Sequence, residues 1–182
     1  MQVSTFPIEG LLEFRPRIFG DDRGAFFESF SARTMEGLGL PHLDWVQDNQ
    51  SSSKAGTVRG LHFQRPPHAQ AKLVRVAQGR ALDVVVDLRK NSPTYGQHAK
   101  VELDAKLGNM FFVPVGFAHG FVALEDNTLF LYKCTDYYAP PAEGGLLWND
   151  PALGIDWQLP SEALVSPKDA ILPKLADLES PF

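Results

Sequence analysis

The stretch from Val58 to Leu88 reads VRGLHFQRPPHAQAKLVRVAQGRALDVVVDL and decides the fold. It is rich in apolar and β-branched residues, whose side chains in a strand point alternately to opposite faces. One face of its runs also carries ionisable groups, among them His62, Lys72 and Asp83. Burying such groups costs free energy unless they are paired or used in chemistry. The stretch therefore predicts a sheet whose inward face lines a pocket.

Strict alternation also predicts which neighbours share a face. In the first run, it places Arg59 with Leu61 and Phe63, and it places His62 on the opposite face with residues 60 and 64. In the second run, Lys72 shares a face with Val74 and Val76. The last run alternates Leu82, Val84 and Val86 with Asp83, Val85 and Asp87.

Short β-prone runs continue on both sides of this stretch. The predicted strands are Trp45–Gln50, Val58–Gln64, Lys72–Ala77, Ala81–Leu88, His98–Leu103, Met110–Val113, His119–Leu124 and Leu129–Asp136. Many short strands separated by Gly- and Pro-rich turns, with little helix, predict a sandwich or a small barrel. We expect a mainly β protein, a cupin-type double-sheet jelly roll with short flanking helices, because such barrels close around a ligand cavity.

The two ends of the chain are expected to flank this barrel. LLEFRPRIF and AFFESF, joined by GDDRG, predict a hairpin at about 11–30, either an edge hairpin with two core phenylalanines or a functional arm. Ser31 can cap a short helix. The barrel is expected at about 44–138. Residues 139–182 are expected to form a strap and a short helix beginning near Lys168 and Asp169, so that 1–182 is a single domain.

Charge and cysteine content exclude several classes of protein. A formal net charge of -5 argues against nucleic-acid binding. The single cysteine, Cys134, excludes an intramolecular disulfide. The first ten residues, MQVSTFPIEG, do not resemble a secretory signal, and no apolar run is long enough to cross a bilayer, so we expect a cytoplasmic protein that does not bind membranes.

Metal chemistry is the first alternative for a cupin-type barrel. RGLHFQ supplies only His62, because Phe63 and Gln64 occupy the positions where further ligands would be expected. His119 alone cannot complete a site that usually needs three protein ligands. We therefore expect chemistry without a metal or another cofactor.

The remaining inward-facing candidates are a base, His62; two cations, Lys72 and Arg59; two acids, Asp83 and Asp169; and a phenol, Tyr132. Singly, each is more often structural. Together, they suit removal of a proton beside a carbonyl group: the imidazole takes the proton, the ammonium stabilises the enolate and the phenol returns a proton. The amides of WVQDNQ suit either a polyhydroxylated ligand or an exposed edge strand.

Nine runs in order resemble the dTDP-4-dehydrorhamnose 3,5-epimerases, which are metal-free cupins of the dTDP-L-rhamnose pathway. These runs are GDDRGAFFESF, WVQDNQS, VRGLHFQ, AQAKLVRV, DVVVDLRKNSPTYG, GFAHGF, YKCTDYY, WNDPALGIDW and SPKD. The resemblance implies that His62 is the general base, that Asp169 pairs with it, and that Tyr132 is the proton donor. Phe63 stands where many members have tyrosine.

The resemblance also implies the ligand contacts and the assembly. The residues expected to contact the sugar nucleotide are Gln47, Asn49, Arg59, Lys72, His119, Glu143 and Lys168. Tyr138 is expected to stack on the thymine. In a homodimer, Arg23, Phe26 and Glu28 are expected to reach the nucleotide bound to the other subunit.

The expected reaction is epimerisation at C3 and C5 of dTDP-4-dehydro-6-deoxy-D-glucose through enolate intermediates. A mono-epimerase acting at C3 or C5 alone would keep the same base and nucleotide contacts, so it stays open as an alternative. A sugar-nucleotide-binding cupin without catalytic activity is the alternative from another class. It would not require His62, Tyr132 and Asp169 together.

Overall fold

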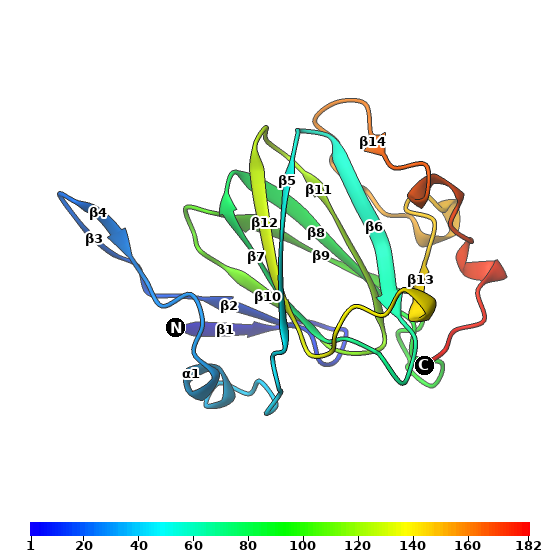
Figure 1. Ribbon diagram of the computed structural model, residues 1–182, viewed down its shortest axis with the longest axis horizontal. Helices are drawn as coiled ribbons and strands as arrows, with labels where there is room; N and C mark the ends of the chain where they lie inside the picture. Colours follow the sequence, from blue (N-terminus) through cyan, green and yellow to red (C-terminus); the bar gives the residue numbers. More distant parts are fainter.

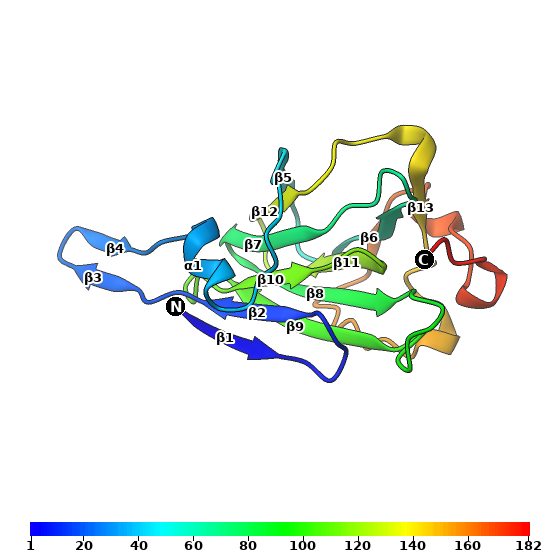
Figure 2. The ribbon, with the colours of Figure 1, turned by 90° about the horizontal axis from the view of Figure 1, so that it is seen from below.

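Two six-stranded β-sheets face each other in the computed structural model, which describes residues Met1–Phe182. The first sheet has the spatial order β1 (Gln2–Thr5), β2 (Leu12–Arg15), β10 (Met110–Val113), β7 (Lys72–Gln78), β12 (Thr128–Cys134) and β5 (Gln47–Ser53). The second has the order β13 (Glu143–Gly145), β6 (Thr57–Gln64), β11 (Phe117–Ala123), β8 (Arg80–Asp87) and β9 (His98–Asp104), and β14 (Leu164–Val165) pairs with β6. All pairings are antiparallel except β14 with β6. Each strand that the sequence predicted has a counterpart, and the double-sheet jelly roll is confirmed (Figures 1 and 2).

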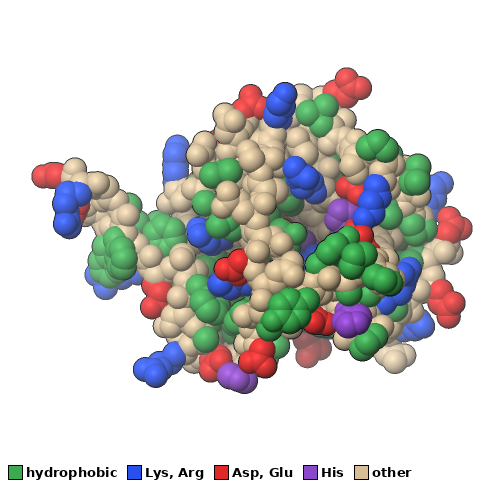
Figure 3. Space-filling model, viewed as in Figure 1, with side chains coloured by type: hydrophobic (Ala, Val, Ile, Leu, Met, Phe, Trp, Pro, Cys, Tyr) green, Lys and Arg blue, Asp and Glu red, His purple; other side chains and the backbone are tan.

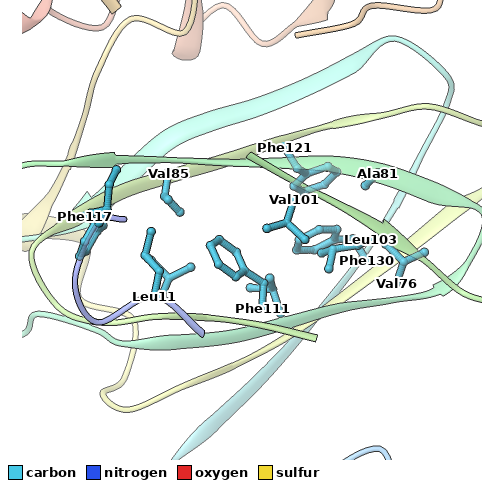
Figure 4. Packing of buried hydrophobic residues seen from close by; sticks show 13 residues of the cluster. Leu11, Val76, Ala81, Val85, Val101, Leu103, Phe111, Phe117, Phe121 and Phe130 are labelled. Atoms are coloured by element: carbon cyan, nitrogen blue, oxygen red, sulfur yellow. The ribbon is translucent and has the colours of Figure 1, made fainter. Parts of the chain in front are cut away.

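The space between the sheets is filled by a cluster of 13 buried hydrophobic residues (Figure 4). Phe121 of the second sheet stacks on Phe130 of the first, with ring centroids 3.9 Å apart and planes within 3° of parallel. Each large side chain buried in this way stabilises the fold by roughly 1.5–3 kcal/mol. The stack therefore holds the sheets together next to the residues that line the pocket.

The outer faces of the two sheets are covered as well. Leu61 and Val84 of the second sheet pack under the C-terminal segment, which contributes Trp157. Phe14 and Met35 belong to a cluster on the outer face of the first sheet. With both faces covered, the strands tolerate apolar residues at nearly every position, which explains the continuous apolar run in β8.

The N-terminal hairpin is shorter than predicted and is paired differently. Leu12–Arg15 joins the first sheet between β1 and β10, and only β3 (Phe19–Asp21) and β4 (Gly24–Phe26) form the hairpin. This hairpin projects from the barrel in both ribbon views (Figures 1 and 2). Phe26 is 73% exposed, so the interpretation that it packs in the core is wrong.

The helical segments are short. The predicted N-terminal helix is confirmed as α1 (Ala32–Glu36), with the Ser31 hydroxyl accepting a hydrogen bond from the Thr34 N–H. The predicted C-terminal helix is instead two 3₁₀ turns, η3 (Asp169–Ile171) and η4 (Leu175–Asp177), because Pro173 between them disfavours a continuous helix. Two further 3₁₀ turns, η1 (Pro140–Ala142) and η2 (Pro151–Leu153), lie in the strap. None of the helices is long and apolar enough to span a bilayer.

An irregularity in β6 changes which residues face the pocket. His62 pairs with His119, and Arg59 pairs with Phe121. The two paired positions are three residues apart in β6 but only two apart in β11, so β6 carries one extra residue. Such a bulge breaks the alternation of side chains. Arg59 therefore lines the same cavity as His62, and the prediction that it shares a face with Leu61 and Phe63 is wrong.

Gly60, within this bulge, has no room for a side chain. It has a φ of +117°, and a Cβ there would lie 2.7 Å from both the Gly120 Cα and the His119 carbonyl oxygen. Only glycine allows the two strands to approach so closely in this conformation. The bulge and the placement of its neighbours therefore depend on this residue.

Candidate active site

A cavity of about 470 Å³ opens into the barrel between strands of both sheets. A neighbouring cavity of about 250 Å³ shares four of its lining residues, namely Asn49, His62, Lys72 and Tyr132. The space-filling view shows the hollow between β5 and β6, with a histidine at its edge (Figure 3). Three of the four residues predicted to be catalytic therefore lie where the two cavities meet.

The fourth, Asp169, lies directly behind His62. Its Oδ1 is 2.7 Å from His62 Nε2, and its Oδ2 accepts a hydrogen bond from the Gly60 N–H at 3.2 Å. Burial opposes ionisation of Asp169. The hydrogen bond and the charge interaction with His62 outweigh this effect, together with the hydrogen bond from the Gly60 N–H, and the pKa of Asp169 is lowered below its usual value. An ionised carboxylate only accepts hydrogen bonds, so His62 Nε2 carries the proton and Nδ1 is free to accept another.

Lys72 and Tyr132 have pKa values shifted by burial in opposite directions. Burial lowers the pKa of the Lys72 ammonium, although Asp83 and Glu143 oppose this shift. Burial raises the pKa of the Tyr132 phenol, which stays protonated at neutral pH. Lys72 Nζ lies 5.8 Å from the centroid of the Tyr132 ring, so a cation and a proton donor stand together in the cavity.

A second histidine–carboxylate pair lies deeper in the barrel. His119 lines the cavity, and its Nε2 lies 2.8 Å from Asp83 Oδ2. The Asp83 side chain is completely buried. The predicted contact residue His119 is therefore held from behind by a carboxylate.

At the mouth of the cavities, several predicted contact residues hold one another in place. Glu143 accepts hydrogen bonds from the Tyr138 hydroxyl at 3.0 Å and pairs with Lys168 at 2.5 Å. Gln47 Oε1 accepts from the Tyr138 backbone N–H, and Gln47 Nε2 donates to Asn49. This network connects the strap to the end of β5.

Arg59 stands at the rim of the larger cavity. Its Nε donates to the Ser53 hydroxyl at 3.1 Å, and its guanidinium also bonds the Ser52 carbonyl. No carboxylate pairs with it. Arg59 is thus a cation available to an anionic ligand.

Arg23, Phe26 and Glu28 are not brought to this site. They belong to the projecting hairpin and the segment after it, and none of them lines either cavity. Arg23 instead pairs with Asp21 inside the hairpin. Within one chain, these three predicted contact residues lie apart from the remaining ones.

Ser51 is a lining residue that the sequence analysis missed. Its hydroxyl is buried, has no hydrogen-bond partner and belongs to the larger cavity. Strand alternation places Gln47 and Asn49 on one face of β5, and extending the same alternation by two positions would have included Ser51. An unpaired buried hydroxyl at a cavity wall is suited to binding a polar ligand.

The charged residues form pairs rather than a metal-binding cluster. No three His, Cys, Asp or Glu side chains are grouped so that they could hold a metal ion. Fold and site together define a class: a double-sheet jelly roll whose cavity holds a histidine–aspartate pair, an ammonium and a phenol. This set of groups is suited to proton transfer beside a carbonyl group.

Comparison with known proteins specifies the family. A family model described as dTDP-4-dehydrorhamnose 3,5-epimerase matches residues 5–177. The dTDP-4-dehydrorhamnose 3,5-epimerase of Salmonella typhimurium is 50% identical over 175 residues, which cover 96% of each chain. The chain belongs to the dTDP-4-dehydrorhamnose 3,5-epimerase family, and the resemblance seen in the sequence is confirmed.

Solved structures agree with this assignment. A dTDP-6-deoxy-D-glucose-3,5-epimerase of Legionella pneumophila, in complex with dTDP-4-keto-L-rhamnose, superposes with a TM-score of 0.94 at 43% identity, covering 98% of this chain and 94% of that one. A 3'-monoepimerase of Streptomyces bikiniensis, in complex with dTDP-quinovose, gives a TM-score of 0.89 at 34% identity, covering 94% and 86%. The fold is thus shared by enzymes named for two inversions and for one.

Proposed function

We propose that this protein inverts C3 and C5 of dTDP-4-dehydro-6-deoxy-D-glucose, giving dTDP-4-dehydro-L-rhamnose for dTDP-L-rhamnose biosynthesis. The observation that carries the proposal is the His62–Asp169 pair, which shares one cavity with Lys72 and Tyr132. The names of the similar proteins and the dTDP-4-keto-L-rhamnose in the Legionella structure support the choice of substrate.

The chemistry follows from the ketone at C4 of this sugar. Both C3 and C5 adjoin the carbonyl, so a proton on either carbon is acidified. His62 Nδ1 takes that proton, and the electrons of the broken C–H bond move to the C4 oxygen. The Lys72 ammonium stabilises the resulting enolate, and the Tyr132 hydroxyl donates a proton to the other face of the carbon, which inverts it. One enolate-stabilising site therefore serves both inversions.

Asp169 is the positioning partner of His62 in this mechanism. It fixes the tautomer that leaves Nδ1 free, and its negative charge stabilises the imidazolium formed after proton removal. The Ser–His–Asp hydrolases use a buried aspartate for the same purpose.

The sugar nucleotide is bound by groups at the rim. The diphosphate requires cations on an acidic protein, and Arg59 and Lys168 line the larger cavity. The exposed ring of Tyr138 stacks on the thymine. Gln47 and Asn49 supply amides, which both donate and accept hydrogen bonds to a sugar.

A homodimer would complete the site. The hairpin of one subunit carries Arg23, Phe26 and Glu28 to the nucleotide bound by the other, which accounts for an exposed aromatic ring on a projecting arm. The cytoplasm is the proposed location of the reaction.

The alternative function is inversion at one carbon only. The structural similarity to the Streptomyces bikiniensis 3'-monoepimerase supports this alternative. The number of carbons that exchange their protons with solvent separates the possibilities, because the enolate for each inversion forms only after its own C–H bond is broken.

The test is incubation of the protein with the 4-keto sugar nucleotide in D2O, followed by reduction and stereochemical analysis. Two exchanged carbons with L-rhamnose stereochemistry are expected. One exchanged carbon indicates the mono-epimerase, and none indicates a binding protein without activity. His62→Ala should abolish exchange at both carbons, and exchange retained at either one would refute a shared base.

A further inference from the structure

Residues 135–139 connect the two sheets beside the smaller cavity. The chain leaves the first sheet at the end of β12 and, after η1, joins the second sheet as β13 (Figure 1). These residues belong to no strand or helix, so their backbone polar groups need partners outside the regular ladders. The segment carries Tyr138, whose ring lines the smaller cavity and is 55% exposed. Whatever holds this backbone therefore also determines where the ring lies.

Two glutamine side chains hold the backbone at Tyr138 and on both sides of it. Gln64 of β6 donates from Nε2 to the Tyr137 carbonyl oxygen at 3.1 Å. Its Oε1 accepts from the Ala139 N–H at 2.8 Å. Between these two bonds, the Tyr138 N–H donates to Gln47 Oε1 of β5 at 2.9 Å. The backbone of Tyr138 is thus held by one glutamine from each sheet.

Gln64 has no N–H left for a ligand. An amide NH₂ group has two hydrogens, and besides the Tyr137 carbonyl, Gln64 Nε2 also donates to the His68 carbonyl oxygen at 2.7 Å. The Gln64 side chain is buried, with 5% exposure, although it lines the smaller cavity. A buried amide whose donors are all used holds backbone in place rather than binding a ligand.

The far end of the Tyr138 ring is held as well. Its hydroxyl donates to Glu143 Oε2 at 3.0 Å, and Glu143 pairs with Lys168. Glu143 lies directly opposite Gln64 in the β13–β6 pairing. The ring is therefore fixed at both ends before a ligand arrives, and a group that is already ordered loses less entropy on binding.

We propose that Gln64 is a positioning residue for nucleotide recognition, which holds the backbone on both sides of Tyr138 so that the ring is oriented to stack on the base of a nucleoside diphosphate sugar. The inference rests on the proposed function, because it gives the stacking of Tyr138 a structural cause. Gln64 touches no ligand atom in this role. Without its hydrogen bonds, the ring is correctly oriented for only part of the time, and the apparent affinity for the nucleotide falls by that fraction.

Gln64→Met tests the role, because methionine has nearly the same length and removes all three hydrogen bonds. We expect the Kd for dTDP, measured by calorimetry, to rise by about fivefold to twentyfold. The Kd for inorganic diphosphate, which has no base to stack, should stay within about twofold. With the sugar nucleotide, KM should rise by a factor similar to that for dTDP, and kcat should stay within about twofold. A merely structural residue would weaken the binding of both ligands and lower kcat.

Tyr138→Ala measures how much the ring itself contributes. Loss of an aromatic stacking partner weakens the binding of a base by about 5- to 150-fold. If Gln64 acts through the ring, adding Gln64→Met to Tyr138→Ala should change the Kd for dTDP by less than about twofold. Additive losses would overturn the inference, because Gln64 would then affect the nucleotide by another route.

Asn109→Leu is the matched control. Asn109 is a buried amide that, like Gln64, accepts from one backbone N–H, that of Asp104, and donates twice, to Glu13 Oε1 and to the Glu102 carbonyl. It lies outside both cavities. Thermal unfolding should show that this variant is less stable, and its Kd for dTDP should stay within about twofold of that of the unmodified protein. An unchanged Kd in Gln64→Met, or an equal loss of affinity in Asn109→Leu, would overturn the inference.

A second measurement needs neither activity nor a folded variant. Amide hydrogen exchange, followed by NMR, should show the Tyr138 and Ala139 N–H groups of the unmodified protein to be protected from solvent. In Gln64→Met, the protection of Ala139 should be lost. Unprotected amides in the unmodified protein, or no binding of dTDP by it, overturn the inference. If no deuterium enters the sugar carbons in D2O while the affinity for dTDP responds as expected, the proposed function fails and the role of Gln64 stands.

Discussion

Asp169→Asn should inactivate His62 by moving a single proton. Asp169 accepts two hydrogen bonds, from His62 Nε2 at 2.7 Å and from the Gly60 N–H at 3.2 Å. Asparagine has one acceptor oxygen and one NH₂ group. The Gly60 N–H can only donate, so the amide oxygen must face it and the NH₂ must face His62. The imidazole then has to accept at Nε2 and carry its proton on Nδ1, the atom proposed as the base.

The size of the effect can be worked out from the charges. When His62 takes the substrate proton, an imidazolium forms beside the Asp169 carboxylate. For charges about 4 Å apart at an effective dielectric constant of about 20, the attraction is about 4 kcal/mol. At 1.36 kcal/mol per factor of ten, its loss corresponds to about 10³-fold in rate. Because the His62 side chain is 31% exposed, solvent recovers part of this energy, and we expect a loss of about 10²–10³-fold.

The assay is the initial rate of deuterium incorporation at C3 and C5 in D2O, with thermal unfolding as a check on folding. Glu36→Gln is the control, because it makes the same carboxylate-to-amide change 2.8 Å from His42 on the exposed surface. It should leave exchange within about twofold of the unmodified rate. If folded Asp169→Asn kept more than about a third of that rate, neither the tautomer nor the charge argument would hold.

Two further predictions follow from the same structure. Tyr132→Phe removes the proposed proton donor and leaves the base, so the rate of product formation should fall by about tenfold or more beyond any fall in the rate of deuterium exchange. Mass gain measures the exchange and product analysis measures turnover. Equal losses in the two rates would argue against Tyr132 as the proton donor. Burial opposes ionisation of Asp87, yet hydrogen bonds from Arg89, Ser92 and Thr94 lower its pKa from 3.8 to about 2. The depressed pKa adds about 2 kcal/mol of stability that is present above about pH 4 and is lost as the pH falls through about 2. Urea unfolding should show that Asp87→Asn has a free energy of unfolding lower by that amount at pH 7, and this difference from the unmodified protein should shrink toward pH 2. A difference that stays constant with pH would contradict the lowered pKa of Asp87.

Alternation of side chains predicted much of the barrel because most strands here are regular. The same alternation places Phe130 and Tyr132 on one face of their strand, and both do pack on the same core cluster. The rule failed at Arg59, where β6 carries an extra residue relative to β11. A bulge is a property of two paired strands, and nothing in the sequence of one strand reveals its partner's register.

Strand pairing at the N-terminus was missed for a related reason. Leu12–Arg15 has a suitable partner run close by in the sequence, yet it pairs with β1 and β10. Phe14 is completely buried there, in contact with the cluster that includes Met110. The free energy gained by burying Phe14 against a distant strand outweighs the entropic advantage of closing the short loop of a local hairpin. Proximity in the sequence indicates only the second of these two quantities.

Asp169 shows the limit of reasoning from pattern alone. It lies 107 positions from His62 in the sequence, on a 3₁₀ turn. No periodicity connects the two, and only the family resemblance indicated the pairing. The structure adds a second pairing of the same kind, His119 with Asp83, which the resemblance did not imply.

The two histidine–carboxylate pairs explain why only one histidine is suited to act as the base. His62 and His119 face each other on neighbouring strands, and each directs Nε2 to an aspartate. The His62 side chain is 31% exposed to the cavity, whereas that of His119 is 8% exposed. A base must reach the substrate carbon and then release its proton, and the more exposed imidazole can do both. His119, held deeper, is suited to a fixed hydrogen bond with the substrate. Burial, rather than the kind of residue, thus separates the two roles.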